Sequence, residues 1–417
     1  MEEEIRKEFM ELLRLLDEGK LQEFKDKATE CPPVDIAEGL EEIEDEGRVL
    51  RVFRMLPKDI SSDVFSYMTS EQQQLIAESA TNAELKALVD DMFMDDTVDF
   101  LEEMPANVVK KVLQNADEGT RKTINQFLNY PENSAGSVMT AEYVGLKKNM
   151  TVEQAFDYIR KYGVDKETIY TCYVMDEKRR LEGVVTVKDL LMNDYAALMG
   201  DIMDPHVIKA YTTEDQEKVV ETFNEYNLLS LPVVDGEDRL VGIVTVDDAI
   251  DVLQEENTED IAKMAAVVPS EDSYLKTSVF THAKNRFFWL LFLMLSATIT
   301  GSIIQEYEAA FVAIPILVAF VPMVMGTGGN CSSQSSTMVI RGLALGEIRF
   351  KDFFKVLFKE LRIALVTGTA LALVNAVRVY LMYGRNQEVL SQVGIGRLAL
   401  ISGLSLIGTV TLAKCIG

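Results

Sequence analysis

The strongest constraint on the fold of this chain is a set of four long apolar segments in its last third. Each is close to the roughly 20 residues that an α-helix needs to cross the hydrocarbon core of a bilayer. They cover residues 287–304, 309–329, 361–382 and 394–417. Residues 283–417 are therefore predicted to form an α-helical transmembrane bundle, with the lipid bilayer as a partner.

Charge divides the chain at the same place. Residues 283–417 contain twelve Lys or Arg and six Asp or Glu, a net charge of +6, so the formal charge of −26 for the whole chain leaves −32 on residues 1–282. This acidic part is also rich in aliphatic and aromatic residues, so it is expected to fold. Its charge repels the phosphates of nucleic acids and attracts divalent cations, although a solvated acidic surface would explain it as well. A nucleic-acid partner is not expected.

Basic residues between the second and third apolar segments indicate the orientation of the chain. The short connection after the first segment contains Glu306 and Glu308 and no basic residue. Positive charge marks the cytoplasmic side of membrane spans. The basic residues are Arg341, Arg349, Lys351, Lys355, Lys359 and Arg362. We therefore expect a multi-pass protein of the cell membrane with its acidic part in the cytoplasm.

Residues 1–130 have the periodicity of short amphipathic helices. The first run ends on Gly19, and later runs are separated by the stretch CPP at 31–33, by Pro57 and by Pro105. No strand pattern interrupts them. This succession of loosely repeated helices predicts a small helical superhelix.

Residues 137–253 contain a duplication. The stretch SVMTAEYVGLKKNMTVEQAFDYIRKYG is echoed by DIMDPHVIKAYTTEDQEKVVETFNEYN, and YVMDEKRRLEGVVTVKDLL is echoed by PVVDGEDRLVGIVTVDDAI. Each unit reads as an extended stretch, a helix opened by a capping Thr, a two-stranded hairpin and a second helix. The units, residues 137–195 and 200–250, resemble a pair of cystathionine-β-synthase (CBS) domains, a module that often binds adenine nucleotides.

The CBS resemblance implies a nucleotide site. In that family a Thr or Ser followed three residues later by Asp addresses ribose hydroxyls, and the pattern occurs here as Thr186 to Asp189 and as Thr245 to Asp248. Tyr170 offers a ring for stacking on adenine. The candidate residues for ATP or another adenine nucleotide are Tyr170, Thr186, Lys188 and Asp189. The same Thr is equally an ordinary helix N-cap, and Tyr170 is equally a core residue.

An acidic helix is predicted to connect the cytoplasmic part to the membrane part over residues 247–268. Its sequence begins DDAIDVLQEENTEDIAKM, which predicts a continuous helix to about Met264. Carboxylates recur along it at three-to-four spacing and so lie on one face. They are Asp248, Asp251, Glu255, Glu256, Glu259 and Asp260.

The second apolar segment has the chemistry of a pore lining. It contains Pro315 and Pro322 and then passes into PMVMGTGGNCSSQSSTMVIRG. Irregular backbone at membrane depth is tolerated only where protein or a water-filled cavity surrounds it. Tight helix packing would explain the glycines, but not Asn330 and Gln334 one turn apart. Carbonyl and amide oxygens can select hydrated Mg²⁺. The candidate pore residues are Gly326, Gly328, Gly329, Asn330 and Gln334.

This chain resembles the MgtE family of magnesium channels and transporters over essentially all of its 417 residues. The resemblance rests on the order of its parts: a helical domain, a CBS pair, an acidic connecting helix, and membrane segments that contain PMVMGTGGNCSSQSSTMVIRGLALGEI. It implies a homodimeric magnesium channel with its pore at the dimer axis, held closed by magnesium ions between the cytoplasmic domains. The acidic helix matches the connecting "plug" helix of the family.

The same resemblance implies where magnesium binds. In the helical domain, DDMFMDDTVDFLEE resembles the stretch that faces the plug helix. In the second CBS unit two carboxylates match sensing positions, whereas Asn227 stands where a carboxylate can occur. The candidate metal ligands are Asp95, Asp96, Asp99, Asp215 and Glu217, together with the six acidic residues of the connecting helix.

The resemblance stops short at the end of the sequence. The family has a fifth span with an intramembrane Asp that binds the permeating ion, whereas these residues end in the fourth span. None of the four predicted spans contains Asp or Glu, so the expected ligands in the pore are amides and carbonyls. Residues 1–417 alone are expected to conduct poorly.

Two other functions stay open. A secondary magnesium transporter would use the same segments, although no inverted repeat is detectable in them. A magnesium-responsive or nucleotide-responsive membrane sensor would keep the CBS pair without conduction. An enzyme is not indicated, because His206 and His282 are isolated and no nucleophile motif occurs.

Overall fold

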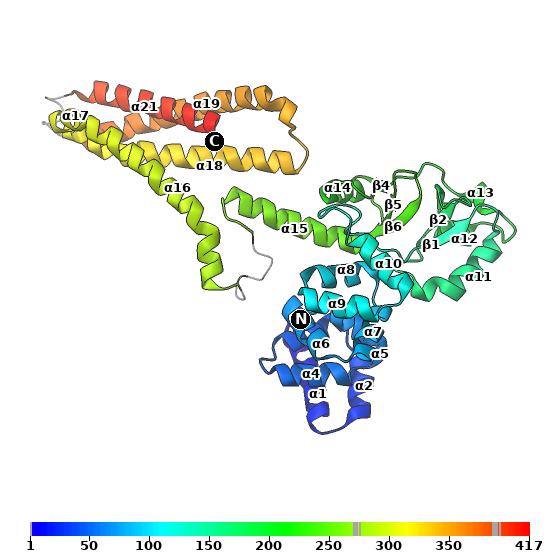
Figure 1. Ribbon diagram of the computed structural model, residues 1–417. Coiled ribbons are helices and arrows are strands. Elements are labelled where there is room, and N and C mark those ends of the chain that lie inside the picture. The colour runs from blue at the N-terminus through cyan, green and yellow to red at the C-terminus, as the bar shows by residue number, and fades with distance from the viewer. Residues whose placement is uncertain (1, 270–273, 275–276, 386–390, 392) are drawn as a thin grey trace. The chain divides into compact units, whose positions relative to one another are not determined.

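The computed structural model describes residues 2–269, 274, 277–385, 391 and 393–417 (Figure 1). The chain divides into two compact units. The first ends at Leu253, and the second, which contains the apolar segments, runs from Gln254 to Gly417. Each unit is described below by itself.

The first 127 residues of unit one are helical. Helices α3, α5, α7 and α9 pack in succession, as do α4, α6, α8 and α10, which gives two layers of a short superhelix. The predicted helical domain is therefore confirmed. The helices are α1 (Glu2–Asp17), α2 (Leu21–Glu30), α3 (Pro33–Glu41), α4 (Glu46–Met55), α5 (Lys58–Ser66), α6 (Ser70–Ser79), α7 (Asn82–Asp91), α8 (Met94–Glu103), α9 (Ala106–Asn115) and α10 (Glu118–Phe127).

These helices are short because start signals follow one another closely. Pro57 and Pro105 stand at the N-caps of α5 and α9. Thr81 forms a capping box with Glu84 at α7, which satisfies free backbone N–H groups at the helix start. Phe65 and Phe100 meet edge to face in the core, with ring centroids 5.0 Å apart.

The CBS pair consists of two small three-stranded sheets. The first unit comprises β1 (Val144–Lys147), α11 (Val152–Tyr162), β2 (Thr171–Met175), β3 (Leu181–Thr186), α12 (Val187–Met192) and α13 (Met199–Ile202). The second comprises β4 (Ala210–Tyr211), α14 (Gln216–Tyr226), β5 (Ser230–Val234), β6 (Leu240–Thr245) and the start of α15 (Val246–Met264). In each sheet the first two strands are parallel and the last two antiparallel.

The duplication extends to backbone irregularities. The β2–β3 register shifts between Val174 and Met175, and the β5–β6 register shifts at the equivalent pair, Val233 and Val234. The sheets also contact each other, because the Tyr173 hydroxyl lies 2.7 Å from Ser230 Oγ. The predicted tandem pair is therefore confirmed.

The helical domain packs on the second CBS sheet. Val98 of α8 and Phe127 of α10 share a buried cluster with Met139, Phe223 and Leu231. This core fixes the start of α8 close to the CBS pair.

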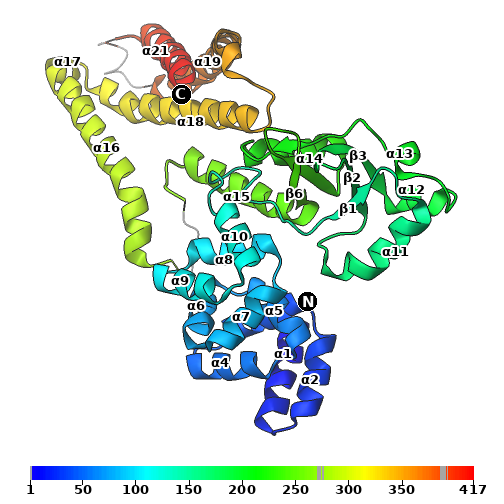
Figure 2. The same ribbon diagram turned by 45° about the vertical axis from the view of Figure 1, so that its right-hand side comes forward.

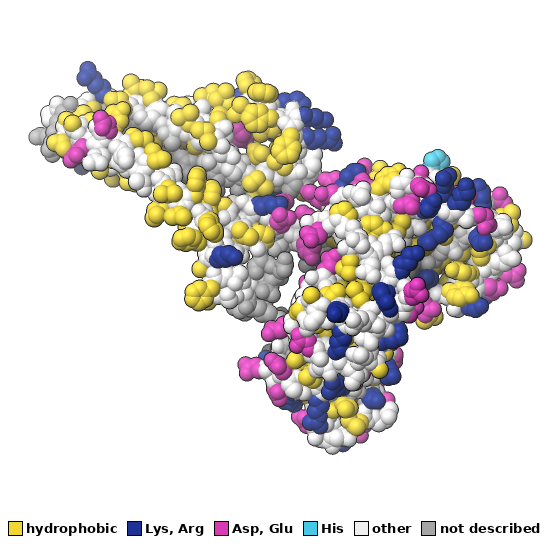
Figure 3. Space-filling view, viewed as in Figure 1, with side chains coloured by type: hydrophobic (Ala, Val, Ile, Leu, Met, Phe, Trp, Pro, Cys, Tyr) yellow, Lys and Arg dark blue, Asp and Glu magenta, His cyan; other side chains and the backbone are white. Residues whose placement is uncertain are grey.

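Among its described residues, unit two contains four helices that are long and apolar enough to cross a membrane, over residues 279–306, 315–343, 350–383 and 395–416. Many of their apolar side chains are exposed, as Figure 3 shows for this unit and as expected of a lipid-facing surface. The four predicted spans are thus confirmed. The elements are α16 (Val279–Glu306), α17 (Glu308–Ala313), a 3₁₀ turn (Pro315–Phe320), α18 (Val321–Ala344), α19 (Phe353–Tyr383) and α21 (Ile395–Ile416).

Two details of the predicted spans are wrong. The Gly- and Ser-rich stretch is continuous α18 and not irregular backbone, since a helix satisfies its own N–H and C=O groups at membrane depth. Pro322 is tolerated as the second residue of α18. The helix of the third span includes Glu360, because α19 begins at Phe353 and not near residue 361.

Helices α18, α19 and α21 lie side by side (Figure 1 and Figure 2). Helices α18 and α21 are parallel, because the residue numbers of their contacts rise together, from Gly328 with Thr409 to Ser335 with Lys414. Contacts between α19 and α21 run in opposite directions, from Gly368 with Ile407 to Glu360 with Lys414. The basic residues that begin α19 therefore lie beside the C-terminal ends of α18 and α21.

Candidate functional site

Carboxylates from three parts of unit one converge where the helical domain meets the CBS pair. We call this set the acidic cluster. Asp95 and Asp96 occupy the first turn of α8, where the partial positive charge of a helix start favours anions. The first turn of α15 contributes Asp247 and Asp248. The full cluster is Asp63, Asp95, Asp96, Glu142, Glu167, Asp247, Asp248 and Asp251, since these groups influence one another electrostatically.

Hydrogen bonds position the cluster. The Ser66 hydroxyl donates to Asp96 Oδ2 at 2.9 Å. Glu142 Oε2 accepts from the Thr140 hydroxyl at 2.7 Å and from the Met94 N–H at 3.4 Å, so it connects the CBS pair to the start of α8. The Thr245 hydroxyl donates to Asp248 Oδ2 at 2.5 Å.

Burial and like charge oppose ionisation of three carboxylates near the centre of the cluster, Glu167, Asp248 and Asp95. Burial raises the pKa of Glu167 to about 7, and repulsion from Asp248 and Asp247 adds to it. Burial also raises the pKa of Asp248 to about 6, by more than its hydrogen bond with Thr245 lowers it. The pKa of Asp95 rises well above its usual range, first through burial and then through repulsion from Asp248.

No basic side chain balances this charge in the part of the chain that the structure describes: none of the cluster carboxylates forms an ion pair with Lys or Arg there. Glu167 Oε2 is buried and has no hydrogen-bond partner among the described residues. Buried carboxylates of this kind need a proton or a cation.

The cluster is suited to a hydrated cation more than to a bare one. The described residues contain no group of three or more His, Cys, Asp or Glu side chains in position to hold a metal ion directly. Magnesium dehydrates reluctantly and is often held through one or two carboxylates and several waters. A converging, uncompensated set of carboxylates therefore fits Mg²⁺ without a complete protein cage.

The structure brings together some of the predicted metal ligands and adds others. Asp95, Asp96, Asp248 and Asp251 are in the cluster. No sequence pattern points to Glu142 or Glu167, which lie outside the helices and strands of the first CBS unit. None points to Asp63 either. Asp247 could have been found, because it directly precedes Asp248 in the acidic run.

Three predicted ligands on α8 and at α14 lie outside the acidic cluster. Asp99 is exposed on α8. Asp215 accepts from the Glu217 N–H at 3.0 Å and caps α14, and the Glu217 side chain is exposed. Asn227 ends α14 with φ of 51°, a left-handed conformation that Asn adopts more easily than most residues, which accounts for Asn at this position.

The remaining predicted ligands lie on the last part of α15, in unit two. Glu255 is exposed, whereas Glu256, Glu259 and Asp260 are half-buried. Glu259 pairs with Lys263 at 2.6 Å. These acidic residues share one face of α15 because of their spacing along that helix.

The candidate nucleotide residues share one edge of the first CBS sheet. Thr186 and Asp189 form a capping box at α12, and the Val187 N–H donates to the Tyr170 carbonyl at 3.0 Å. Tyr170 is 66% exposed, so it is not a core residue. Lys188 is exposed in the first turn of the same helix.

The candidate pore residues lie on two sides of α18. Asn330 and Gln334 are exposed one turn apart. A Cβ atom at Gly326 or Gly329 would meet nothing within 4 Å, whereas one at Gly328 would lie 2.9 Å from Thr409 Cγ2. Gly328 therefore serves helix packing, and the other two glycines open onto free space.

Comparisons with known families cover most of the chain. Residues 31–133 match the family described as MgtE intracellular N domain, and residues 321–417 match the family described as divalent cation transporter. Residues 135–194 and 199–255 match the CBS domain.

Two curated relatives are similar over nearly their whole length. The magnesium transporter MgtE of Thermus thermophilus is 34% identical over 95% of this chain and 88% of its own. The protein of the same name from Bacillus subtilis is 32% identical over 88% of this chain and 81% of its own.

Two solved structures resemble unit one. The cytosolic domain of the Mg²⁺ channel MgtE in complex with ATP is 34% identical, with a TM-score of 0.55, and covers 58% of this chain and 99% of its own. The soluble part of a magnesium transporter is 29% identical, with a TM-score of 0.58, and covers 60% and 99%.

Proposed function

Because this chain belongs to the MgtE family of magnesium transporters, we propose that it conducts magnesium as a homodimeric channel that closes when cytoplasmic magnesium binds. The observation that carries the proposal is the acidic cluster, in which the helical domain, the CBS pair and α15 contribute carboxylates with no basic partner among the described residues.

Magnesium would act on this cluster as a bridge. Like charges about 4 Å apart repel by roughly 4 kcal/mol per pair at an effective dielectric of 20, so the empty cluster favours separation of α8 from α15. A divalent ion replaces repulsion by attraction and holds the elements together. A few such pairs suffice to bias a two-state gate, and closure by bound magnesium provides negative feedback.

The remaining predicted ligands belong to the same proposal. Asp99, Asp215 and Glu217, and the acidic residues Glu255, Glu256, Glu259 and Asp260 on α15, would bind further magnesium ions when their partner surfaces approach. Asp99, Asp215, Glu217 and Glu255 are exposed and the other three are half-buried, so a hydrated ion can reach each of these carboxylates.

The pore would be lined by Asn330 and Gln334 of α18. Both are exposed, and Gly326 and Gly329 leave the backbone accessible on the open side of the helix. Amide and carbonyl oxygens at this surface would receive the hydrated ion. A second copy of the chain, related by a two-fold axis, would complete the lining.

An adenine nucleotide is the second proposed ligand. ATP is present in the related cytosolic-domain structure, and in this chain Tyr170, Thr186, Lys188 and Asp189 lie at one sheet edge. The Tyr170 ring would stack on adenine, Asp189 would accept from ribose hydroxyls, and Lys188 would pair with phosphate.

We further propose a division into a helical domain (1–130), two CBS domains (137–195 and 200–250), a connecting helix (247–268) and a transmembrane domain (283–417). Transport of this kind needs no enzyme chemistry and no nucleic acid. The acidic part would face the cytoplasm, because the basic residues between α18 and α19 mark that side.

Limited proteolysis of the purified chain, with and without millimolar Mg²⁺, tests the sensor. Magnesium is expected to slow cleavage of the first unit, and Glu167→Gln together with Asp248→Asn is expected to weaken that protection. Asp157→Asn, on the exposed face of α11, is the matched control. Digestion that is identical with and without magnesium would refute the sensor.

A further inference from the structure

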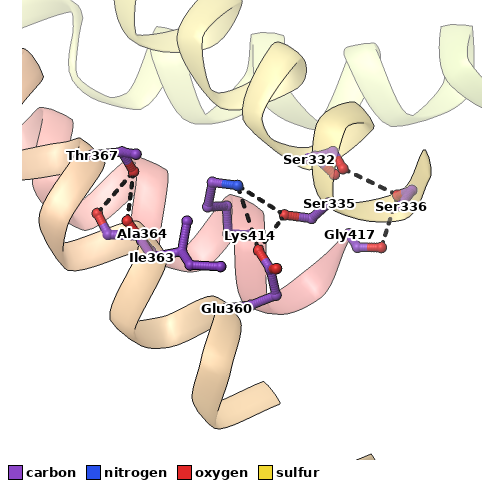
Figure 4. Close-up of polar contacts among 9 residues, drawn as sticks. All are labelled: Ser332, Ser335, Ser336, Glu360, Ile363, Ala364, Thr367, Lys414 and Gly417. Atoms are coloured by element: carbon purple, nitrogen blue, oxygen red, sulfur yellow. Dashed lines mark hydrogen bonds and ion pairs between the residues drawn. The ribbon is translucent and has the colours of Figure 1, made fainter. Parts of the chain in front are cut away.

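A charged pair lies between three helices of the membrane unit. Glu360 of α19 and Lys414 of α21 have side chains only 15% and 8% exposed, and Lys414 Nζ lies 3.4 Å from Glu360 Oε2. Ser335 of α18 joins them (Figure 4): its hydroxyl donates to Glu360 Oε2 at 2.9 Å and accepts from Lys414 Nζ at 3.2 Å. We call these three residues the polar latch.

Two further contact residues of α18 near the latch are small. Gly328 approaches Thr409, and Cys331 packs with Ala364 and Val410. Small residues let helices approach closely but interlock weakly. Apolar packing alone therefore leaves the rotation of α18 about its axis poorly defined. Buried polar pairs add little net stability but can fix register, which is what this interface needs.

The latch is coupled to the proposed pore lining by helix geometry. Successive residues of an α-helix are about 100° apart around its axis. With Cys331 and Ser335 buried, Asn330 and Gln334 point to the open side of α18. Rotation of α18 by about 100° would move the Asn330 and Gln334 amides to the buried positions of Cys331 and Ser335. Gln334, Glu360 and Lys414 also line one cavity of about 900 Å³, so the latch borders the space that the pore residue faces.

We propose that Glu360 and Lys414 are positioning residues for cation transport, which act through Ser335 to fix the rotation of α18 and thereby the direction of Asn330 and Gln334. The positive charge of Lys414 also compensates the negative charge of Glu360, which leaves cation selection to the amides. This inference rests on the proposed pore and goes beyond it by naming what holds the lining in place.

The native thiol of Cys331 reports on the latch without any transport measurement. Cys331 is 8% exposed, so it reacts slowly with a maleimide while α18 is held in place. The full chain in lipid nanodiscs is labelled with N-ethylmaleimide, and modification is measured by mass spectrometry on the peptide that contains Cys331. Glu360→Gln and Lys414→Met are each expected to speed labelling at least about tenfold, because one buried partner is left without its counter-charge.

Two further variants control for general damage. The charge swap Glu360→Lys with Lys414→Glu restores an opposite pair and is expected to return labelling toward the parent rate. Asp352→Asn removes the pair with the exposed Lys355, which lines the same cavity, and is expected to leave labelling unchanged. Single variants that label at the parent rate, or a charge swap that labels as fast as they do, would overturn the latch.

A measurement of ion preference distinguishes a role of Glu360 in positioning the pore amides from a role in stability alone. In cells that express the protein, the ratio of Mg²⁺ to Co²⁺ uptake is expected to shift by about threefold or more in Glu360→Gln, and no further when Asn330→Ala is added. A parent ratio in Glu360→Gln would overturn the positioning role. A parent ratio in Asn330→Ala would overturn the proposed pore, while the Cys331 labelling would still decide the latch.

Discussion

The Thr245 hydroxyl donates to Asp248 Oδ2 at 2.5 Å, and the equivalent hydroxyl of Thr186 donates to Asp189 Oδ2 at the same distance. The duplicated Thr-x-x-Asp therefore has one local geometry in both CBS units. Its surroundings differ. Asp189 belongs to the first turn of α12, which is bonded through the Val187 N–H to the carbonyl of the exposed Tyr170, whereas Asp248 belongs to the acidic cluster. One inherited motif thus serves a candidate nucleotide site in the first unit and a candidate cation site in the second.

Replacement of Thr186 by Val should affect both stability and nucleotide binding. The change removes the N-cap of α12 and should lower the free energy of unfolding by about 1 kcal/mol. It should also weaken ATP binding, measured by isothermal titration calorimetry. Thr151→Val is the matched control, since Thr151 forms the same capping box at α11. Equal stability losses with equal ATP affinities would show that Thr186 is only a cap.

Magnesium binding should weaken as the pH falls. The pKa of Glu167 is raised to about 7 and that of Asp248 to about 6, so acid returns protons to both carboxylates and a cation must displace them. Between pH 8 and pH 6 the deprotonated fraction of Glu167 falls about tenfold, and the magnesium affinity should fall by at least that factor. Titration calorimetry across this range measures the effect. Glu167→Gln should flatten the profile, and a steep profile in that variant would contradict the assignment.

Without magnesium, unit one should become less stable as the pH rises from about 4 to 7. Glu167 and Asp248 have higher pKa values folded than unfolded, so the folded state binds their protons more tightly. The resulting stability is fully present at pH values below the pKa of each group in the unfolded state. It is lost as the pH rises through the pKa of that group in the folded state. After a discount for partial exposure, roughly 2 kcal/mol should be lost. Thermal unfolding at several pH values measures it, and saturating Mg²⁺ should abolish the decline.

The sequence was sufficient for features that depend on local periodicity. The short helices before residue 130, the CBS duplication and the four apolar spans all follow from spacing within single segments, and the structure confirms them. The candidate site was only partly predictable. Glu142 and Glu167 join Asp95 only because the core around Val98 and Phe127 packs the helical domain on the CBS pair. No local pattern encodes such a contact.

The membrane part shows a different limit. Apolarity defines the middle of a span but not the end of its helix. The apolar pattern therefore predicts Glu360 outside a helix that in fact includes it and in which it pairs with Lys414. The Gly- and Ser-rich run predicts irregular backbone, because those residues are poor helix formers in water. At membrane depth the cost of unsatisfied backbone groups outweighs that preference, and α18 stays helical. The remaining site assignments, including the amides of α18, stay predictions.

Gly328 and Gly329 should respond differently to Ala, although they are neighbours. A Cβ atom at Gly328 would lie 2.9 Å from Thr409 Cγ2, and a β-branched side chain on a packed helix cannot easily move away. Gly328→Ala should therefore separate α18 from α21 and lower stability by about 1–3 kcal/mol, the usual cost of overpacking. At Gly329 nothing lies within 4 Å, so Gly329→Ala should unfold at the parent temperature or slightly above it. Thermal unfolding in one detergent compares the two proteins.

If Gly329 borders the pore, its Ala variant should also transport magnesium more slowly despite normal folding. An equal loss of stability in both variants would show instead that Gly329 too is a packing residue.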